Sequence, residues 1–205
     1  LFAMLFGAGV AILLERARDS GDARPIRSHV FRMLVLFAIG ACHAILLANN
    51  DVLRLYAMAG LFVPLFLRLD PRKLLVAGGV LMAIHAIAGS VIAYQWITAT
   101  PGTPSALLPA QIFGNDPAAL DYARVIGIES FGERLHRRIF GFGAALETQI
   151  PGIPSALGTM LVGAGLWRIG LLKGEWPRSR CIALARRMTL IALPPLVAFI
   201  AVDWR

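Results

Sequence analysis

The sequence is poor in charged residues and in cysteine, and both shortages narrow the class of protein. Charged residues make up 16% of its 205 residues, against about 25% in an ordinary soluble domain. Its two cysteines, Cys42 in an apolar stretch and Cys181 in a basic loop, form neither a disulfide framework nor a metal-binding spacing. The rest is strongly apolar, with 58% hydrophobic residues and a mean hydropathy of +0.70. These values predict an integral membrane protein.

Several common functional motifs are also missing from the sequence. It contains no phosphate-binding loop, metalloprotease motif or nucleophile elbow, and Gly141-Phe142-Gly143 lacks the third glycine of a dinucleotide-binding loop. A net charge of +8 does not indicate a nucleic-acid partner, because the basic residues flank apolar blocks and do not form one stripe with aromatics. We therefore expect the lipid bilayer as a partner, no nucleic acid, and no evident cofactor.

Six apolar blocks approach the length that crosses a bilayer. They cover residues 1–14, 31–49, 52–67, 74–97, 153–172 and 188–202. The first would reach only about 21 Å as a helix, so we expect a truncated first span and a missing N-terminal part. The fold class predicted is an all-α, polytopic transmembrane helix bundle of about six spans. Pro64, Pro194 and Pro195 lie within spans and predict kinks. Each proline leaves a backbone carbonyl without its helical partner, and neighbouring groups must satisfy that carbonyl.

The charges between the blocks predict the orientation of these spans. Basic residues fill alternate connections: Arg16, Arg18, Arg24, Arg27 and Arg32 the first, Arg68, Arg72 and Lys73 the third, and Lys173, Arg178, Arg180, Arg186 and Arg187 the fifth. The second connection, Asn49-Asn50-Asp51, has none. Because lysine and arginine accumulate on the cytoplasmic side, we expect the second and fourth connections to lie outside a bacterial inner (plasma) membrane crossed several times.

The long fourth connection divides the chain into three predicted regions. Residues 1–97 would form spans one to four, 98–152 an extracytoplasmic loop, and 153–205 spans five and six. Within the loop, apolar residues recur at helical spacing from about residue 117 to 140. We expect an amphipathic helix there, lying either at the outer membrane interface or as a solvated helix packed on the bundle.

A group of polar residues at the second connection is the main candidate for chemistry. His43 lies about 9 Å below the expected outer end of the second span. An ionisable residue inside the membrane indicates a functional site. The alternative is a neutral histidine that only bonds a backbone carbonyl and serves the structure. Asp51 and Arg54 share one side of the third helix, and Tyr56 follows. The carboxylate could orient the imidazole in a site for handling protons or holding anions. Alternatively, Asn50 or Asp51 only caps the helix and Arg54 marks the interface.

Two further features concern the interior of the bundle. His85, at mid-depth in the fourth span, either faces the same cavity or is a core histidine. Two sets of small residues predict surfaces of helix contact. They are Gly40, Ala44 and Ala48 in the second span, and Gly158, Gly163, Ala164 and Gly165 in the fifth.

Four segments together resemble the YeiB-like family of bacterial inner-membrane proteins of unknown function. They are Leu5 to Ala11 (LFGAGVA), Gly40 to Leu47 (GACHAILL), Asn50 to Ala57 (NDVLRLYA) and Met160 to Leu172 (MLVGAGLWRIGLL). Their order and spacing follow the family pattern LFGAGxA, GxxHxxLL and GDILxxYA and a C-terminal domain, so the resemblance covers most of the chain. Asn50 stands where the family usually has glycine, and the family's N-terminal motif region is absent.

The resemblance extends distantly to transmembrane acyltransferases, in which a histidine near the outer face assists acyl transfer to an extracytoplasmic acceptor. It implies His43 as the base or acyl-handling residue, Asp51 as its orienting residue and Arg54 as an anion contact. From their positions in the sequence alone, Tyr56 and His85 are further substrate-binding candidates. An acyl donor such as acyl-CoA and an envelope glycan or lipid acceptor would follow. The alternatives are a membrane transporter, favoured by His85 and the proline-interrupted spans, and a non-catalytic scaffold.

Overall fold

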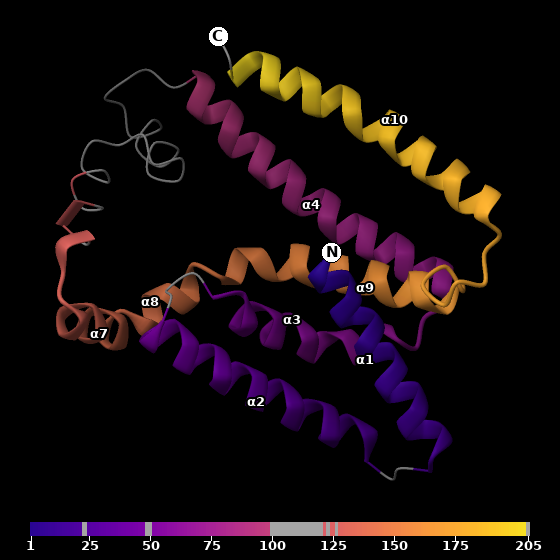
Figure 1. Cartoon of the computed structure of the whole chain (residues 1–205), viewed down its shortest axis with the longest axis horizontal. Helices are drawn as coiled ribbons and strands as arrows, with labels where there is room; N and C mark the ends of the chain where they lie inside the picture. The colour runs from indigo at the N-terminus through magenta and orange to yellow at the C-terminus, as the bar shows by residue number, and fades with distance from the viewer. Residues whose placement is uncertain (22–23, 48–50, 99–120, 122–123, 126, 204–205) are drawn as a thin grey trace. The chain divides into compact units, whose positions relative to one another are not determined.

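The chain folds as helices connected by loops. A computed structural model describes residues 1–21, 24–47, 51–98, 121, 124–125 and 127–203, and these residues include no strand. The helices are α1 (Phe2–Asp19), α2 (Pro25–Leu46), α3 (Val52–Phe66), α4 (Pro71–Thr98), α7 (Phe131–Phe140), α8 (Phe142–Glu147), the short 3₁₀ helix η1 (Ile150–Gly152), α9 (Ile153–Arg168) and α10 (Arg178–Asp203). The all-α prediction is confirmed, and each of the six apolar blocks lies largely within a helix (Figure 1).

Three stretches of helix are long and apolar enough to cross a membrane. They are Pro25–Leu46, Pro71–Gln95 and Phe142–Arg168, and Val52–Phe66 is a shorter apolar helix. The last stretch joins α8, η1 and α9. In α1, Glu15, Arg16, Arg18 and Asp19 occupy the C-terminal turns, so that its apolar part is short. The described helices therefore fit an integral membrane protein, and the count of six spans stays a prediction.

Helices α2 and α3 form an antiparallel pair. In this pair a histidine of α2 satisfies the carbonyl that a proline leaves without a hydrogen bond in α3. Pro64 inside α3 has no N–H to donate to the carbonyl of Gly60, four residues earlier. Nε2 of the buried His29 in α2 lies 2.9 Å from that oxygen. Since the protonated ring nitrogen donates to the carbonyl, α3 continues through Pro64 without an orphaned acceptor. The prediction that neighbouring groups satisfy such carbonyls is confirmed at this proline.

Glycines set the close contacts of α9 with α1 and with α4. A side chain on Gly7 would overlap the Met160 carbonyl, and one on Gly163 would overlap the Met4 carbonyl, so α1 and α9 cross with backbones touching. A Cβ on Gly158 would lie 2.7 Å from the Gly78 oxygen. The predicted contact surface of the fifth span is thus confirmed, because only residues without side chains allow such approaches.

The fourth connection departs from its predicted helix. Glu129 and Ser130 are not helical, and α7 begins only at Phe131, where Ser130 caps it. The Ser130 hydroxyl accepts the Glu133 N–H at 3.3 Å, while the Glu133 carboxylate accepts the Ser130 N–H at 2.8 Å. The expected helix from 117 to 140 is therefore wrong as one continuous element, because this capping box starts a new helix. Residues 117–120, 122, 123 and 126 lie outside the described part.

The chain divides into two compact units, Leu1–Gly165 and Leu166–Arg205. In the second unit, the Trp176 indole N–H donates to the Ile169 carbonyl at 2.9 Å, and the Arg180 guanidinium lies 3.8 Å from the centre of the Trp176 ring. These contacts fix the loop that leads into α10. Helix α10 continues through Pro194 and Pro195.

Candidate functional site

Asp51 is the buried centre of the candidate site. It stands at the N-cap of α3 in an extended conformation, and its Oδ2 accepts the Arg54 backbone N–H at 3.0 Å. Its side chain is fully enclosed. The interpretation of Asp51 as a cap is confirmed, and a buried carboxylate must also find positive or donating neighbours. Arg54 and His43 provide them.

Arg54 turns its guanidinium toward Asp51 and away from any open surface. Its Nε lies 3.4 Å from Asp51 Oδ2, and the residue is only 1% exposed. The guanidinium carbon also lies 5.3 Å from the centre of the Phe142 ring, within the range of a cation–π contact. In this arrangement Arg54 neutralises and positions Asp51. Its role as a contact for an anionic substrate stays a prediction.

Gly40 allows the turn to approach α2 closely. A Cβ at this position would meet Asp51 Oδ2 at 2.7 Å and the Arg54 backbone nitrogen at 2.8 Å. Ala44, one turn later, is 2% exposed. The predicted contact surface of the second span is confirmed at these two positions, while Ala48 lies outside the described residues. The absence of a side chain at Gly40 brings the Asp51 carboxylate against the face of α2 that carries His43.

His43 completes what we call the polar cluster, which consists of His43, Asp51 and Arg54. Its Nδ1 lies 3.3 Å from Asp51 Oδ1, within ion-pair distance but without hydrogen-bond alignment. Both atoms are buried, whereas 37% of the histidine side chain is exposed. The exposed part of the ring therefore lies away from Asp51. A carboxylate beside Nδ1 favours the tautomer with the proton on Nδ1, which leaves Nε2 as a base.

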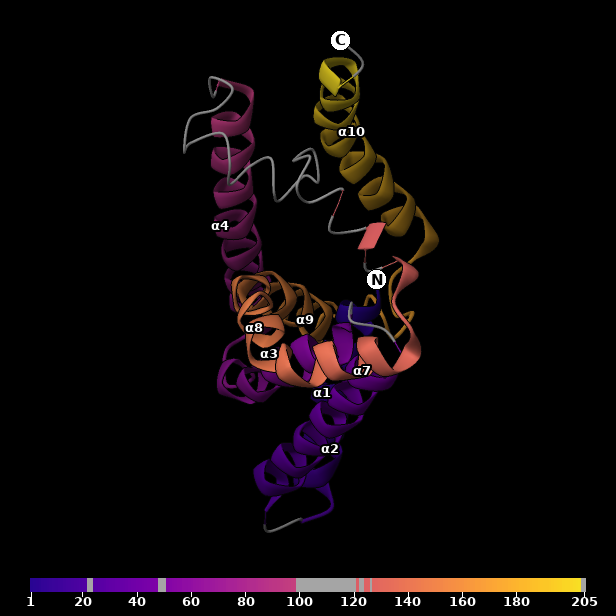
Figure 2. The same ribbon diagram turned by 90° about the vertical axis from the view of Figure 1, so that its left-hand side faces the viewer.

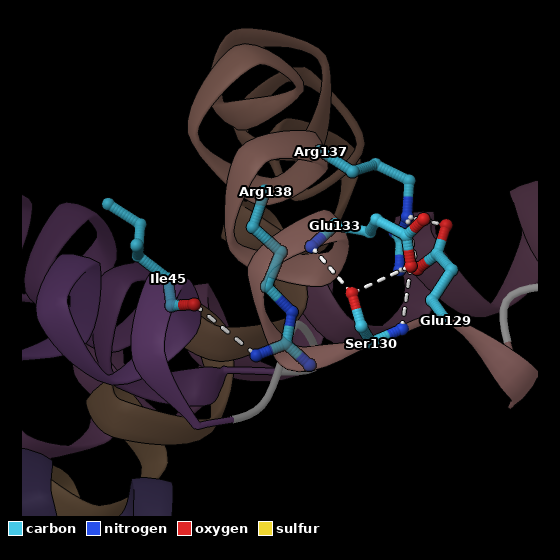
Figure 3. Close-up of polar contacts among 6 residues, drawn as sticks. All are labelled: Ile45, Glu129, Ser130, Glu133, Arg137 and Arg138. Carbon is cyan, nitrogen blue, oxygen red and sulfur yellow. Dashed lines mark hydrogen bonds and ion pairs between the residues drawn. The ribbon is translucent and has the colours of Figure 1, made fainter.

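A second segment covers the same end of the α2–α3 pair. We call residues 130–149 the cover segment; Figure 2 shows its helices α7 and α8 beside these two helices. Arg138 donates from Nη1 to the Ile45 carbonyl at 3.3 Å (Figure 3), and Gln149 donates from Nε2 to the Asp51 carbonyl at 2.8 Å. With Phe142 over Arg54, three residues of the cover segment hold the turn that carries Asp51.

The cover segment is itself braced at its start. Arg137 donates to the Glu129 carboxylate from Nη2 at 2.8 Å and from Nε to both carboxylate oxygens at 3.0 and 3.1 Å. In Figure 3 this pair and the Ser130–Glu133 cap gather together, while Arg138 reaches separately toward Ile45. Hydrogen bonds from the Ser130 hydroxyl and backbone N–H hold the pKa of Glu133 below its usual value. The cap is strongest while Glu133 is ionised.

Two of the residues predicted for the site lie elsewhere. Tyr56 contacts Phe6, with ring centres 6.0 Å apart, and lines a hollow between α1, α2 and α3. His85 is exposed on α4, and no described contact joins it to the polar cluster. Among the described residues, no group of three or more histidine, cysteine, aspartate or glutamate side chains is placed to hold a metal ion. Of the residues predicted for the site, the structure thus brings together His43, Asp51 and Arg54.

Two bacterial proteins are similar in sequence to this chain. The chain is 30% identical over 221 aligned residues to the uncharacterized protein YeiB of Escherichia coli (strain K12), a match that covers the whole chain and 50% of that relative. This match supports a YeiB-like family for the chain. It is also 37% identical over 76 residues to the uncharacterized protein YxaH of Bacillus subtilis (strain 168), covering 37% of the chain and 19% of that relative. No family model and no solved structure matches.

This YeiB-like chain spans about half the length of the YeiB protein that it matches. Both relatives are uncharacterized and have no stated activity. Together with the apolar helices of this chain, they fit an integral membrane protein of unknown function. Its resemblance to acyltransferases stays a prediction.

Four residues that shape or flank the site of this YeiB-like chain are not among those predicted from its sequence. They are His29, Arg138, Phe142 and Gln149. For His29 there was a signal, because a proline within a span requires a donor for the carbonyl four residues before it. The three cover-segment residues carried no such signal, since their partners lie far away in the sequence.

Proposed function

We propose that this YeiB-like chain carries part of the site of a membrane enzyme that transfers an acyl group to an extracytoplasmic acceptor. The observation that supports the proposal is the pairing of His43 with Asp51. The carboxylate is enclosed, Nδ1 faces it at 3.3 Å, and the rest of the imidazole is partly open. This division into a held nitrogen and an accessible ring is what a general base requires.

The proposed reaction uses His43 as a proton carrier. Nε2 takes the proton of an acceptor hydroxyl as the hydroxyl oxygen attacks the carbonyl carbon of an acyl donor, for example an acyl thioester such as acyl-CoA. The new C–O bond forms, the bond from the acyl carbon to the carrier breaks, and the imidazolium returns its proton to the leaving thiolate or alkoxide. The products are the acylated acceptor and the free carrier. Asp51 stabilises the imidazolium during the step.

The other members of the polar cluster act through position. Arg54 and the backbone N–H of Arg54 hold Asp51 Oδ2, so that Oδ1 remains directed at His43. Gln149 holds the backbone of the same residue from the cover segment. A rigid orienting carboxylate lowers the reorganisation needed when charge develops on the ring.

The test offers labelled acyl donors and envelope glycans or lipids to the purified full-length protein in proteoliposomes. His43→Ala is expected to lower the transfer rate by about 100-fold or more, the usual contribution of a general base. His136→Ala replaces an exposed histidine on α7 and serves as the matched control, with the rate expected to stay unchanged. An unchanged rate in His43→Ala would overturn the proposal.

Topology supplies a second test, since the proposal requires the polar cluster to open outside. After replacement of Cys42 and Cys181, a cysteine at Asn50 should react with an impermeant maleimide added to intact cells, while one at Asp22 should react only after permeabilisation. Both positions lie outside the described residues, at the two connections flanking α2. The reverse pattern would place the cluster in the cytoplasm.

A scaffold without chemistry is the competing function, because Asp51 also caps α3 and Arg54 is fully enclosed. In a scaffold, His43→Ala would alter stability alone and no acyl transfer would depend on it. The transporter alternative has less support here. Its basis in the sequence is His85 and the proline-interrupted spans. His85 is exposed and apart from the cluster. His29 satisfies the carbonyl freed by Pro64 without unwinding α3, and α10 continues through Pro194 and Pro195.

A further inference from the structure

A hollow with apolar walls lies beside the polar cluster. It has a volume of about 410 Å³. Its lining comes from the first turns of α1, the middle of α2 and the start of α3: Phe2, Phe6, Leu36, Val52, Leu53 and Tyr56. A space of this size and lining suits an apolar ligand.

The hollow and His43 share one face of α2. Leu36 lies seven residues before His43, which places the two side chains on the same side of the helix about 10.5 Å apart along its axis. The opposite wall begins with Val52, the residue directly after Asp51. An extended chain lying in the hollow along α2 would therefore end near the open part of the His43 ring.

The path from the hollow to His43, which we call the route, runs along a side of α2 that would contact lipid. Helix α2 is long and apolar enough to span a bilayer. Ile39 and Leu46 of this helix and its C-cap Leu47, all within about a turn of His43, are 54%, 50% and 71% exposed. Since exposed apolar residues on a spanning helix face lipid chains, the hollow and the base are continuous with the bilayer surface of α2.

Positive charge lies at the end of the same route. Arg134 and Arg138 are one turn apart on α7, and no described carboxylate pairs with either of them. Arg138 already reaches the end of α2 at Ile45, two residues after His43. By contrast, Glu129 binds Arg137. A guanidinium group at the end of α2, with a second one turn away on α7, matches the anionic headgroup of a molecule whose alkyl chain fills the hollow.

We infer that one substrate of the proposed reaction is an anionic membrane lipid, which enters from the bilayer with an alkyl chain in the hollow and its headgroup between His43 and the arginines of α7. The inference rests on the proposed acyl transfer and gives that reaction its substrate class. Tyr56, predicted as a substrate-binding residue, lines the chain-binding part of this site.

Photo-crosslinking of the full-length protein in proteoliposomes tests the binding step without relying on catalysis. The probe is phosphatidylglycerol with a diazirine near the end of one acyl chain, and phosphatidylcholine with the same chain is the uncharged comparison. Crosslinks are expected to be several times denser on residues 2–6 and 52–56 than on Val80, Ile84 and Ile87, exposed residues of α4 that report ordinary lipid contact. Phosphatidylglycerol should give more of them than phosphatidylcholine.

Two variants separate the site from general lipid contact. Leu36→Trp should fill the hollow and lower the crosslinking there to the level of α4. Leu34→Trp, the same change at an exposed position of α2 outside the hollow, should leave it unchanged. Replacing Arg134 and Arg138 together by glutamine should remove the preference for phosphatidylglycerol. Crosslinking that is equal on the hollow and α4, or unaffected by Leu36→Trp, would overturn the inference.

The outcome also separates this inference from the proposed function. Acyl transfer that depends on His43 but proceeds with water-soluble donor and acceptor alone, without specific crosslinking, would leave the proposed function standing and remove the lipid substrate. Specific crosslinking in a protein whose transfer does not depend on His43 would count against both, because the lipid would then be bound but not used by the base.

Discussion

The two histidines of α2 differ in what they contact, and the contrast separates a structural site from a candidate reactive one. His29 and His43 are fourteen residues apart, about 21 Å along one helix. His29 is 5% exposed and bonds a neutral carbonyl, so that its ring is enclosed as part of the packing. His43 meets a buried carboxylate on one side and is open on the other. An imidazole can work as a base only in the second setting.

The difference arises from what each end of α3 requires. At Pro64 the helix lacks a donor for one carbonyl, and a neutral ring N–H supplies it. At Asp51 the helix begins with a charged cap, and the cap requires nearby positive or donating groups because it is buried. Two histidines of α2 therefore have different roles, donating to a carbonyl and facing a carboxylate. The group that α3 presents to each histidine determines its role.

The largest expected effect comes from removing the charge at the reactive end. Asp51→Ala should lower the free energy of unfolding by about 3–5 kcal/mol, because it deletes the α3 cap and takes the carboxylate from the enclosed Arg54. Asp51→Asn keeps an acceptor for the cap and should cost less. Reversible unfolding of the full-length protein in mixed micelles measures both. A loss of unfolding free energy below about 1 kcal/mol for Asp51→Ala would mean that the ion pairs of Asp51 contribute little to the stability of the polar cluster.

A smaller effect is expected at the structural end, where a double mutant sharpens the comparison. His29→Phe should cost about 1–3 kcal/mol, because the Gly60 carbonyl loses its donor within the packed interior. Pro64→Ala provides a backbone N–H for that same carbonyl. Combined with Pro64→Ala, His29→Phe should therefore cost clearly less than it does alone, with a coupling of about 1 kcal/mol. Additive losses in the same unfolding assay would show that His29 stabilises the fold in another way.

The smallest effect is expected at the start of the cover segment. The pKa of Glu133 is lowered in the folded protein by the Ser130 hydroxyl and N–H, so its contribution is present above the ordinary glutamate pKa of about 4.3 and is lost as the pH falls through the lower folded value. Hydrogen exchange of the first turn of α7 should thus quicken toward low pH, after correction for intrinsic rates. In Glu133→Gln this pH dependence should disappear. Its persistence would assign the effect to other carboxylates.

Much of the fold follows from local pattern, and some of the site does too. Apolar blocks of spanning length predicted the helices, and the small residues of the second and fifth spans predicted their close contacts. The Asp51 cap follows from an acidic residue just before an apolar helix. The continuous helix from 117 to 140 failed because apolar periodicity outweighed the Ser130-x-x-Glu133 signal, which is equally local and marks a helix start.

The sequence by itself determined an all-helical membrane protein with a capped turn and a histidine near it, since bilayer thickness, helical spacing and capping all act over a few residues. Only the tertiary structure decided which histidine satisfies a carbonyl and which faces a carboxylate. It also decided that Arg138 and Gln149 reach Ile45 and Asp51, 93 and 98 residues earlier in the chain. Such contacts depend on how the helices pack, and no local spacing encodes them.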